Sequence, residues 1–269
     1  MATGIAEVVA RSGMQAIVRA RTEASTVASR AVLADGLSRQ VAKGKLTKEE
    51  ERRILGNVLF VTDLGELVDC HIVIESVVED LETKQKLFRE LDMATKPSAI
   101  LATNTSTLPV VELARVVRQP ERVCGIHFFN PAAVLPLVEI VRPVTASDET
   151  MERATRFVAD IGKDGVKVLD RAGFIVNALL FPYLNNAVRM LEAGTASMED
   201  IDIAMKGGCN FPMGPFALLD LVGLDTALAI LETLQASFGD TNFAPRPMLR
   251  ELVAEGRLGR KTKAGFYVY

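Results

Sequence analysis

The chain has few of the residues from which disulfide frameworks and metal sites are built. Its three cysteines, Cys70, Cys124 and Cys209, are scattered along 269 residues and form no Cys-x-x-Cys pair. This pattern indicates neither a disulfide framework nor a metal site, and it suits a reducing cytoplasm, where we expect the protein to act. The sequence also lacks any uninterrupted apolar run of about eighteen residues, so we predict no membrane span.

An excess of either charge is also missing. The formal net charge is −3 and the isoelectric point is about 5.6, so the charge gives no reason to expect a nucleic-acid partner. There are no internal repeats, low-complexity tracts or blocks of like charge. The composition, 49% hydrophobic and 24% charged, is that of a soluble globular protein, and the length suffices for two domains.

The first thirty residues have an unusual composition. They contain few acids, Glu7 and Glu23, among several arginines and serines, which superficially resembles a transit peptide. The glycine at position 13 and the apolar run 14–18 instead favour a helix, a turn and a strand. We therefore interpret these residues as part of the fold.

Strands and helices alternate over the first 170 residues. Apolar residues have helical spacing at 3–12, 23–43 and 81–95, and short apolar strands occur at 16–18, 60–61, 72–74, 99–103, 123–128 and 135–141. Thr47 and Glu50 have the spacing of a capping box, which marks the start of a further helix. Alternation of this kind predicts a parallel sheet covered on both faces. We predict a Rossmann-like, doubly wound α/β domain over residues 1–170.

Beyond position 173 no convincing strand follows until the last few residues. Helices are predicted at 175–193, 198–206, 215–222, 226–238 and 248–254, with Ser197 and Asp200 capping the second of them. The first of these helices is apolar on nearly every side, so we expect it to be largely buried. We predict an all-helical domain over residues 171–269, joined through a hinge at 170–173.

Two polar residues interrupt consecutive apolar strands. His127, one of two histidines in the chain, lies near the end of the strand 123–128, and Glu139 lies inside the apolar segment 137–141. If these strands are neighbours, the carboxylate can orient the imidazole and favour its cationic form, leaving the other ring nitrogen to take a proton. The alternative is a strand-end histidine bonded to backbone, with the glutamate on a solvated edge.

The sequence opens where a dinucleotide-binding fingerprint ends. In such folds a strand, a Gly-x-Gly-x-x-Gly turn and a helix follow one another, and the pyrophosphate lies at the helix N-terminus. Residues 1–6 match only the end of that pattern, with Ala2 in the place of the third glycine. The first strand and the first two glycines are absent. An ordinary helix start is the simpler interpretation of these six residues alone.

A series of short motifs follows in a fixed order. They are 74–80 (IESVVED), 103–106 (TNTS), 125–131 (GIHFFNP), 173–177 (GFIVN), 212–215 (PMGP), 223–226 (GLDT) and 259–267 (GRKTKAGFY). In this order they resemble the short-chain L-3-hydroxyacyl-CoA dehydrogenases, including bacterial 3-hydroxybutyryl-CoA dehydrogenases. The resemblance covers essentially the whole chain, and the ordered set is more specific than any one motif.

The resemblance implies roles for residues in these motifs. His127 would be the general base, with Glu139 as its partner, taking the proton of a 3-hydroxyl group while C3 passes hydride to a nicotinamide. Ser106 and Asn177 would hydrogen-bond the substrate hydroxyl and the developing carbonyl, and Asn130 would support the site beside the cofactor. The structural alternatives are a helix N-cap for Ser106, a buried polar residue between helices for Asn177 and a turn residue for Asn130.

For the cofactor, the resemblance points to Glu79, Lys84, Ser106 and Lys261, and for the coenzyme A moiety to Lys43. Alternatively, Glu79 and Lys84 form a surface helix pair and Lys43 is a solvated helix end. One departure weakens the assignment of Lys43. The family commonly has a serine one helical stretch before this lysine, where this chain has a glycine at position 36.

A second departure concerns the choice of nicotinamide cofactor. An Asp or Glu at the end of the second strand of such folds binds the ribose 2′-hydroxyl of NAD, whereas this chain has Ala20 between Arg19 and Arg21. Loss of the acid and gain of arginine favour a 2′-phosphate. We therefore expect NADP to be tolerated or preferred, bound through Arg21 or Arg19. In the alternative, both arginines are solvated surface residues.

These observations predict an oxidoreductase that interconverts (S)-3-hydroxyacyl-CoA, notably 3-hydroxybutyryl-CoA, and 3-oxoacyl-CoA with NAD or NADP. By resemblance, the helical domain would form a homodimer. Two alternatives stay open: a truncated, non-catalytic relative that binds acyl-CoA or dimerises, and a sugar-acid dehydrogenase or crystallin-like protein. Because the first strand and its glycines are absent, we expect this chain to bind dinucleotides weakly.

Overall fold

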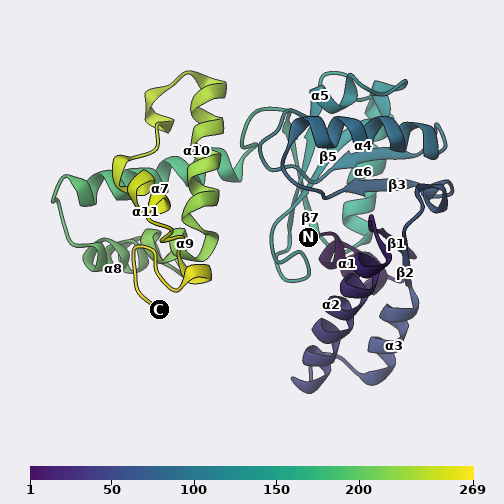
Figure 1. Cartoon of the computed structure of the whole chain (residues 1–269), viewed down its shortest axis with the longest axis horizontal. Helices are drawn as coiled ribbons and strands as arrows, with labels where there is room; N and C mark the ends of the chain where they lie inside the picture. The colour runs from purple at the N-terminus through teal and green to yellow at the C-terminus, as the bar shows by residue number, and fades with distance from the viewer. The chain divides into compact units, whose positions relative to one another are not determined.

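The computed structural model describes all 269 residues, which form two compact units, Met1–Asp170 and Arg171–Tyr269 (Figure 1). The first unit combines strands with helices and the second is built from helices, in agreement with the predicted fold class. No helix in the structure combines the length and the apolar character needed to cross a membrane.

Short strands lie between the helices of the first unit. The strands are β1 (Ala16–Arg19), β2 (Val58–Val61), β3 (Ile72–Glu75), β4 (Ile100–Thr103), β5 (Val123–Phe128), β6 (Leu137–Arg142) and β7 (Asp164–Leu169). The α-helices are α1 (Ala2–Arg11), α2 (Glu23–Ala42), α3 (Lys48–Gly56), α4 (Leu81–Ala94), α5 (Val110–Ala114) and α6 (Asp148–Asp160), with 3₁₀ turns η1 (Leu64–Leu67) and η2 (Pro120–Arg122). The capping box before α3 is confirmed: the Thr47 hydroxyl accepts from the Glu50 amide, and Glu50 accepts from the Thr47 amide.

The strands form two separate sheets. One contains β1 and β2 in parallel, and the other has the order β3-β4-β5-β6-β7. All neighbours in the larger sheet are parallel except β5 and β6, which are antiparallel. The prediction of a parallel sheet is therefore wrong for this pair. No helix separates these two strands, and a short loop can only return the chain in the opposite direction.

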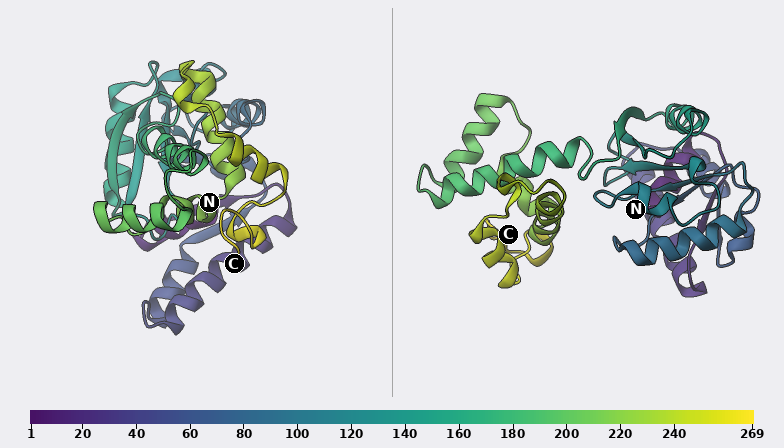
Figure 2. Two further views of the ribbon diagram at one scale, coloured as in Figure 1. Left: turned by 90° about the vertical axis from the view of Figure 1, so that its left-hand side faces the viewer. Right: turned by 90° about the horizontal axis from the view of Figure 1, so that it is seen from above.

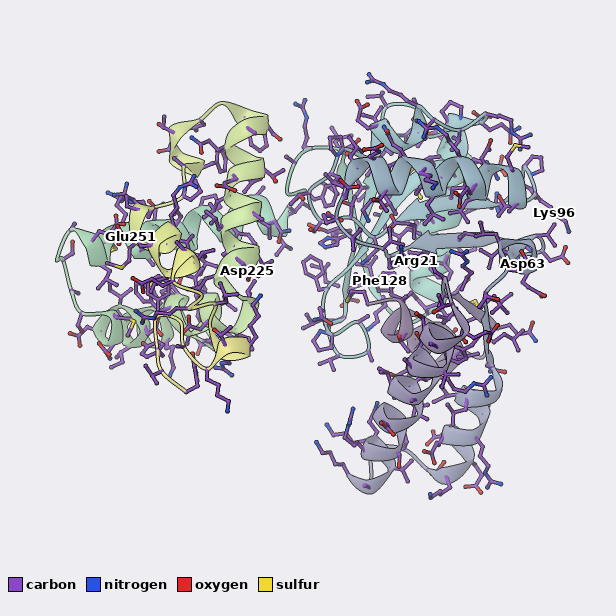
Figure 3. The ribbon with its side chains drawn as sticks, in the orientation of Figure 1. Arg21, Asp63, Lys96, Phe128, Asp225 and Glu251 are labelled. Atoms are coloured by element: carbon purple, nitrogen blue, oxygen red, sulfur yellow. The ribbon has the colours of Figure 1, made fainter.

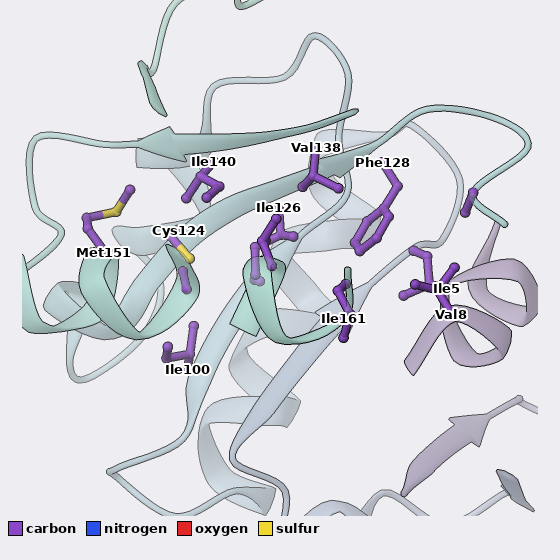
Figure 4. Packing of buried hydrophobic residues seen from close by; sticks show 14 of the residues in the cluster. Ile5, Val8, Ile100, Cys124, Ile126, Phe128, Val138, Ile140, Met151 and Ile161 are labelled. Carbon is purple, nitrogen blue, oxygen red and sulfur yellow. The ribbon is translucent and has the colours of Figure 1, made fainter. Parts of the chain in front are cut away.

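Helices cover both faces of the larger sheet. Helices α4 and α5 pack on one face, and α1 and α6 contribute to the core on the other. In that core Ile126 and Phe128 of β5 and Val138 of β6 pack with Ile5 and Val8 of α1 (Figure 4). Burying a side chain of this size stabilises the fold by about 1.5–3 kcal/mol. Helices α2 and α3 lie side by side beyond the smaller sheet (Figures 1 and 2).

The second unit has no strands, only isolated bridges near its end. Its elements are α7 (Val176–Glu192), α8 (Met198–Cys209), α9 (Pro215–Val222), α10 (Leu224–Phe238), η3 (Thr241–Phe243), α11 (Pro247–Ala254) and η4 (Arg260–Thr262). Leu184 and Val188 of α7 are fully buried, and they pack with Phe216, Leu231 and Leu234. The expectation that α7 is largely buried holds for this face only, because Leu179 is 72% exposed.

Candidate active site

His127 and Glu139 are directly opposed in the antiparallel ladder of β5 and β6. Opposed side chains lie on the same face of a sheet. Nδ1 of His127 is 2.7 Å from Oε2 of Glu139, and the two side chains are 8% and 0% exposed. The alternative of a glutamate on a solvated edge is therefore wrong. A carboxylate in this position fixes the orientation of the ring and stabilises positive charge that forms on it.

The close approach of β5 to β6 depends on a glycine. Gly125 lies opposite Val141, and a Cβ atom at Gly125 would meet the Val141 Cβ at only 2.7 Å. The two strands pair two residues further along at His127 and Glu139. A larger residue at 125 would push apart the strands that carry both side chains.

The loop between β5 and β6 is stabilised by hydrogen bonds from Lys163, a residue outside the loop. Lys163, just before β7, donates from Nζ to the carbonyl oxygens of Ala132 at 2.7 Å and Leu135 at 2.8 Å. Asn130 lies exposed at the start of this loop, where it precedes Pro131 through a cis peptide bond. Its position is that of a turn residue, in line with the structural alternative.

The loop after β4 is fastened to the end of β5 beside His127. The backbone amide of Asn104 donates to the backbone carbonyl of Glu75 at 2.8 Å. The side-chain oxygen of Asn104 accepts from the backbone amide of Phe128 at 2.8 Å. The loop continues to Ser106, which is partly exposed. Ser106 is not a helix N-cap, because Pro109 has that position before α5, so this alternative is wrong.

A buried ion-pair network lies under this loop. Lys84 Nζ is 2.8 and 3.0 Å from the two carboxylate oxygens of Glu75 and 3.3 Å from Glu79. The Lys84 side chain is 1% exposed and that of Glu75 is 0% exposed, whereas that of Glu79 is 37% exposed. The Thr103 hydroxyl also donates to Glu75, at 2.8 Å. The alternative of a surface helix pair is therefore wrong for Lys84.

Glu79 joins that network to the loop that carries Ser106. Its Oε1 accepts from the Thr105 hydroxyl at 2.5 Å and from the Ser106 amide at 2.8 Å. Burial raises the pKa of Glu79, but the Thr105 hydroxyl, the Lys84 ammonium and the Ser106 amide together outweigh it and leave that pKa below its ordinary value of 4.5. The network therefore holds an ionised, partly exposed carboxylate against the loop at neutral pH.

Three predicted residues of the first unit take no part in this cluster. Arg21 is exposed just beyond the end of β1 (Figure 3), while Arg19 donates from Nε to the Thr62 carbonyl at 2.9 Å. Lys43 is exposed at the C-cap of α2. At Gly36, on the same helix, an added Cβ would meet no atom within 4 Å. The site does not require glycine there.

Asn177 and Lys261 belong to the second unit. Asn177 is buried in the first turn of α7, only 8% exposed. Lys261 lies in η4 and donates to both carboxylate oxygens of Asp225, at 2.5 and 2.6 Å (Asp225 is labelled in Figure 3). Burial raises the pKa of Asp225, but hydrogen bonds from Lys261 and from the Thr226 backbone amide outweigh this effect. The pKa of Asp225 therefore lies below its ordinary value.

Two residues of the site had no role assigned from the sequence. Glu75 holds Lys84, and Asn104 fastens the Ser106 loop to β5. For Glu75 a signal existed, because a carboxylate directly at the end of an apolar strand resembles the feature that singled out Glu139, a charge among apolar strand residues. For Asn104 there was none beyond its place after a strand.

Comparisons with known proteins cover the whole chain. Residues 1–171 match the family described as "3-hydroxyacyl-CoA dehydrogenase, NAD binding domain", and residues 173–269 match "3-hydroxyacyl-CoA dehydrogenase, C-terminal domain". The chain is 46% identical to a 3-hydroxybutyryl-CoA dehydrogenase from Mycobacterium tuberculosis, over 100% of this chain and 95% of that protein.

Solved structures with similar folds are also dehydrogenase-family relatives or share high sequence identity with this chain. The crystal structure of FadB2 from M. tuberculosis superimposes with a TM-score of 0.97 at 46% identity, over 99% of this chain and 94% of that one. The (S)-3-hydroxybutyryl-CoA dehydrogenase from Ralstonia eutropha also gives 0.97, at 38% identity, over 100% of this chain and 95% of that one.

Proposed function

Because this chain belongs to the 3-hydroxyacyl-CoA dehydrogenase family of NAD-dependent oxidoreductases, we propose that it interconverts (S)-3-hydroxybutyryl-CoA and acetoacetyl-CoA. The observation that carries the proposal is the buried pair of His127 and Glu139, 2.7 Å apart. An alcohol oxidation needs a group that takes the hydroxyl proton, and an imidazole backed by a carboxylate is suited to that task.

The proposed roles follow from what each side chain can do. His127 takes the 3-hydroxyl proton during oxidation and returns it during reduction, while Glu139 stabilises the charge that the ring then carries. NAD, when bound, supplies the hydride acceptor. Ser106 and Asn177 hydrogen-bond the substrate oxygen, and Asn104 keeps the Ser106 loop next to β5.

Some of the residues proposed to bind the cofactor are suited to contacts with NAD. Helix α1 has no side-chain cap and no acid in its first turn, so its first amides can face an anion such as a pyrophosphate. Glu79 offers an ionised carboxylate at the surface, held there by Lys84, and Lys261 offers a cation. We propose that Lys84 acts on the cofactor through Glu79, because its ammonium is buried between two carboxylates.

We also propose that the chain tolerates NADP through Arg21, since Ala20 takes the place of an acid at the end of β1. Arg21→Ala should then raise KM for NADPH about 10- to 100-fold, because a charge-assisted hydrogen bond contributes about 1.5–3 kcal/mol, and leave KM for NADH unchanged. Steady-state kinetics with both cofactors measures this, with Arg52→Ala as an exposed control. A strong preference for NADH that Arg21→Ala leaves unaltered would dismiss the idea.

The remaining assignments concern partners. We propose that exposed Lys43 contacts the coenzyme A moiety. Homodimer formation through the second unit is supported by exposed apolar side chains such as Leu179 and Ile203, which are 72% and 65% exposed. The three cysteines are unpaired, which suits a cytoplasmic location.

The proposed substrate is tested by following NADH oxidation at 340 nm with acetoacetyl-CoA and, separately, with a panel of the keto forms of sugar acids. We expect turnover with acetoacetyl-CoA and none with the sugar-acid panel. The NADH concentration is raised until the rate with acetoacetyl-CoA saturates. Turnover of the keto form of a sugar acid in its place would instead support the sugar-acid alternative. Absence of turnover of either at every NADH concentration would support a non-catalytic relative.

A further inference from the structure

Asp170 is a partly buried carboxylate that has no role in the reaction described so far. It is the last residue of the first unit and directly follows β7. Its backbone amide donates to the Arg142 carbonyl at 3.0 Å, which continues the pairing of β7 with β6. The larger sheet therefore fixes the backbone of Asp170, while its side chain extends to another element.

That element is α5. The two carboxylate oxygens of Asp170 accept from the backbone amides of Val110 at 3.0 Å and Val111 at 2.7 Å. The first amides of a helix have no partner within the helix, and the N-cap residue of α5 is Pro109, which makes no side-chain bond to them. Asp170, 60 residues from Val110 in the chain, takes the place of this missing cap.

The bonds from Asp170 complete the support of the Ser106 loop, residues 104–109 between β4 and α5. Asn104 fastens the start of this loop to β5, and Glu79 accepts from the Ser106 amide near its middle. Asp170 holds the end where the loop enters α5. The loop is therefore attached to the fold at both ends, and only the bonds from Asp170 link its second end to the strands β6 and β7.

Stability does not account for a carboxylate at this position. Burial raises the pKa of Asp170 above its ordinary value of 3.8, and Glu112 raises it as well, while the bonds from Val110 and Val111 offset this only in part. A carboxyl group whose pKa is raised by folding binds more protons in the folded chain, so stability falls as the pH rises through that pKa. At neutral pH the ionised group therefore lowers the stability of the fold.

We propose that Asp170 is a positioning residue, which fixes the α5 end of the Ser106 loop and thereby holds the Ser106 hydroxyl at the substrate oxygen. This assignment rests on the proposed function, in which Ser106 hydrogen-bonds that oxygen. Asp170 contacts neither substrate nor cofactor in this scheme and acts through the loop alone. A displacement of about 1 Å far from the reacting atoms can lower a rate about 100-fold, so such a contact affects turnover.

A double-mutant cycle separates positioning from a general effect on the fold. Asp170→Asn keeps the size of the side chain but leaves a single oxygen to accept, so kcat/KM for acetoacetyl-CoA should fall about 10- to 100-fold. In a chain that already carries Ser106→Ala, the same substitution should change kcat/KM by less than about twofold, because no hydroxyl remains to be positioned. An equal loss in both backgrounds, or no loss in the parent background, would overturn the proposal.

The matched control is Asp63→Asn. Asp63 is exposed and also accepts from a backbone amide at the start of a helical turn in the first unit, that of Gly65 at 2.9 Å. It makes no contact with the Ser106 loop, so Asp63→Asn should leave kcat/KM unchanged in both backgrounds. The midpoint of urea unfolding should be close to that of the parent chain for Asp63→Asn and for Asp170→Asn.

Amide hydrogen exchange tests the positioning without relying on activity. In Asp170→Asn the amides of Ser106, Thr107 and Leu108 should exchange about tenfold faster than in the parent chain, because the loop opens more often. Asp63→Asn should keep the parent rates at all three. Parent rates at these amides in Asp170→Asn would overturn the proposal.

The two measurements distinguish this proposal from the proposed function. If the parent chain turned over no acetoacetyl-CoA, the proposed function would fail, while the exchange rates would still decide whether Asp170 holds the loop. If Ser106→Ala alone kept the parent kcat/KM, Ser106 would have no role in turnover and the proposal for Asp170 would fail. The assignment of His127 would be unaffected by that second result.

Discussion

Glutamine in place of His127 lowers kcat for acetoacetyl-CoA reduction by about 10²- to 10⁴-fold, the range that a positioned general acid–base contributes. The amide of glutamine is close in size to the imidazole and can still donate to Glu139, but it neither takes up nor releases a proton in the working pH range. Because the loss is in the chemical step, KM for acetoacetyl-CoA should change little. Steady-state kinetics on the purified variant measures both constants.

Two further variants show whether the effect belongs to the pair. His71→Gln removes the only other histidine, which is exposed, and should leave kcat unchanged. Glu139→Gln keeps the volume but removes the charge opposite the ring, so kcat should fall, though by less than in His127→Gln. Far-UV circular dichroism identical to that of the parent chain checks the fold in each case. A His127→Gln variant that retains the parent kcat would exclude His127 as the proton-transfer group.

Methionine in place of Lys84 lowers the free energy of unfolding by about 3–5 kcal/mol, the usual effect of removing one partner from a buried ion pair. Methionine fills nearly the same volume, but Glu75 is 0% exposed and would be left without its cation. Urea unfolding followed by far-UV circular dichroism measures the change. The three tyrosines all lie in the second unit and the chain has no tryptophan, so tyrosine fluorescence reports that unit separately.

The control is Lys86→Met on the exposed side of the same helix, for which we expect a change within about 0.5 kcal/mol. The double variant Glu75→Leu with Lys84→Met should recover much of the stability, because no unpaired charge is then buried. Loss of the Lys84 charge should also raise KM for NADH, since Glu79 loses the cation that holds it. If Lys84→Met destabilises the first unit no more than Lys86→Met, the ion pair does not support the loop.

Several helix ends could be predicted from the sequence because their causes are local. Thr47 with Glu50 and Ser197 with Asp200 bond partners three residues away, and the structure contains both caps. The motif at 125–131 likewise singled out His127, and the isolated charge in β6 singled out Glu139. Both signals depend only on residues that lie close together in the chain.

The same reasoning did not reach Glu75. It too is a carboxylate in an apolar strand, but its partner is set by how α4 packs over β3, and the sequence alone equally allowed Lys84 to lie on the surface. Nor did the alternation of elements reveal that β5 and β6 run in opposite directions. Strand direction depends on the path of the connecting loop through space.

The sequence by itself indicated most strands and helices in their order, though not α5, α6 or β7, and it indicated which side chains could carry chemistry, because each of these signals depends on residues within a few positions. Only the tertiary structure decided that His127 meets Glu139 and that Lys84 is buried between two carboxylates. Register and burial arise from contacts between residues far apart in the chain, which no local pattern specifies.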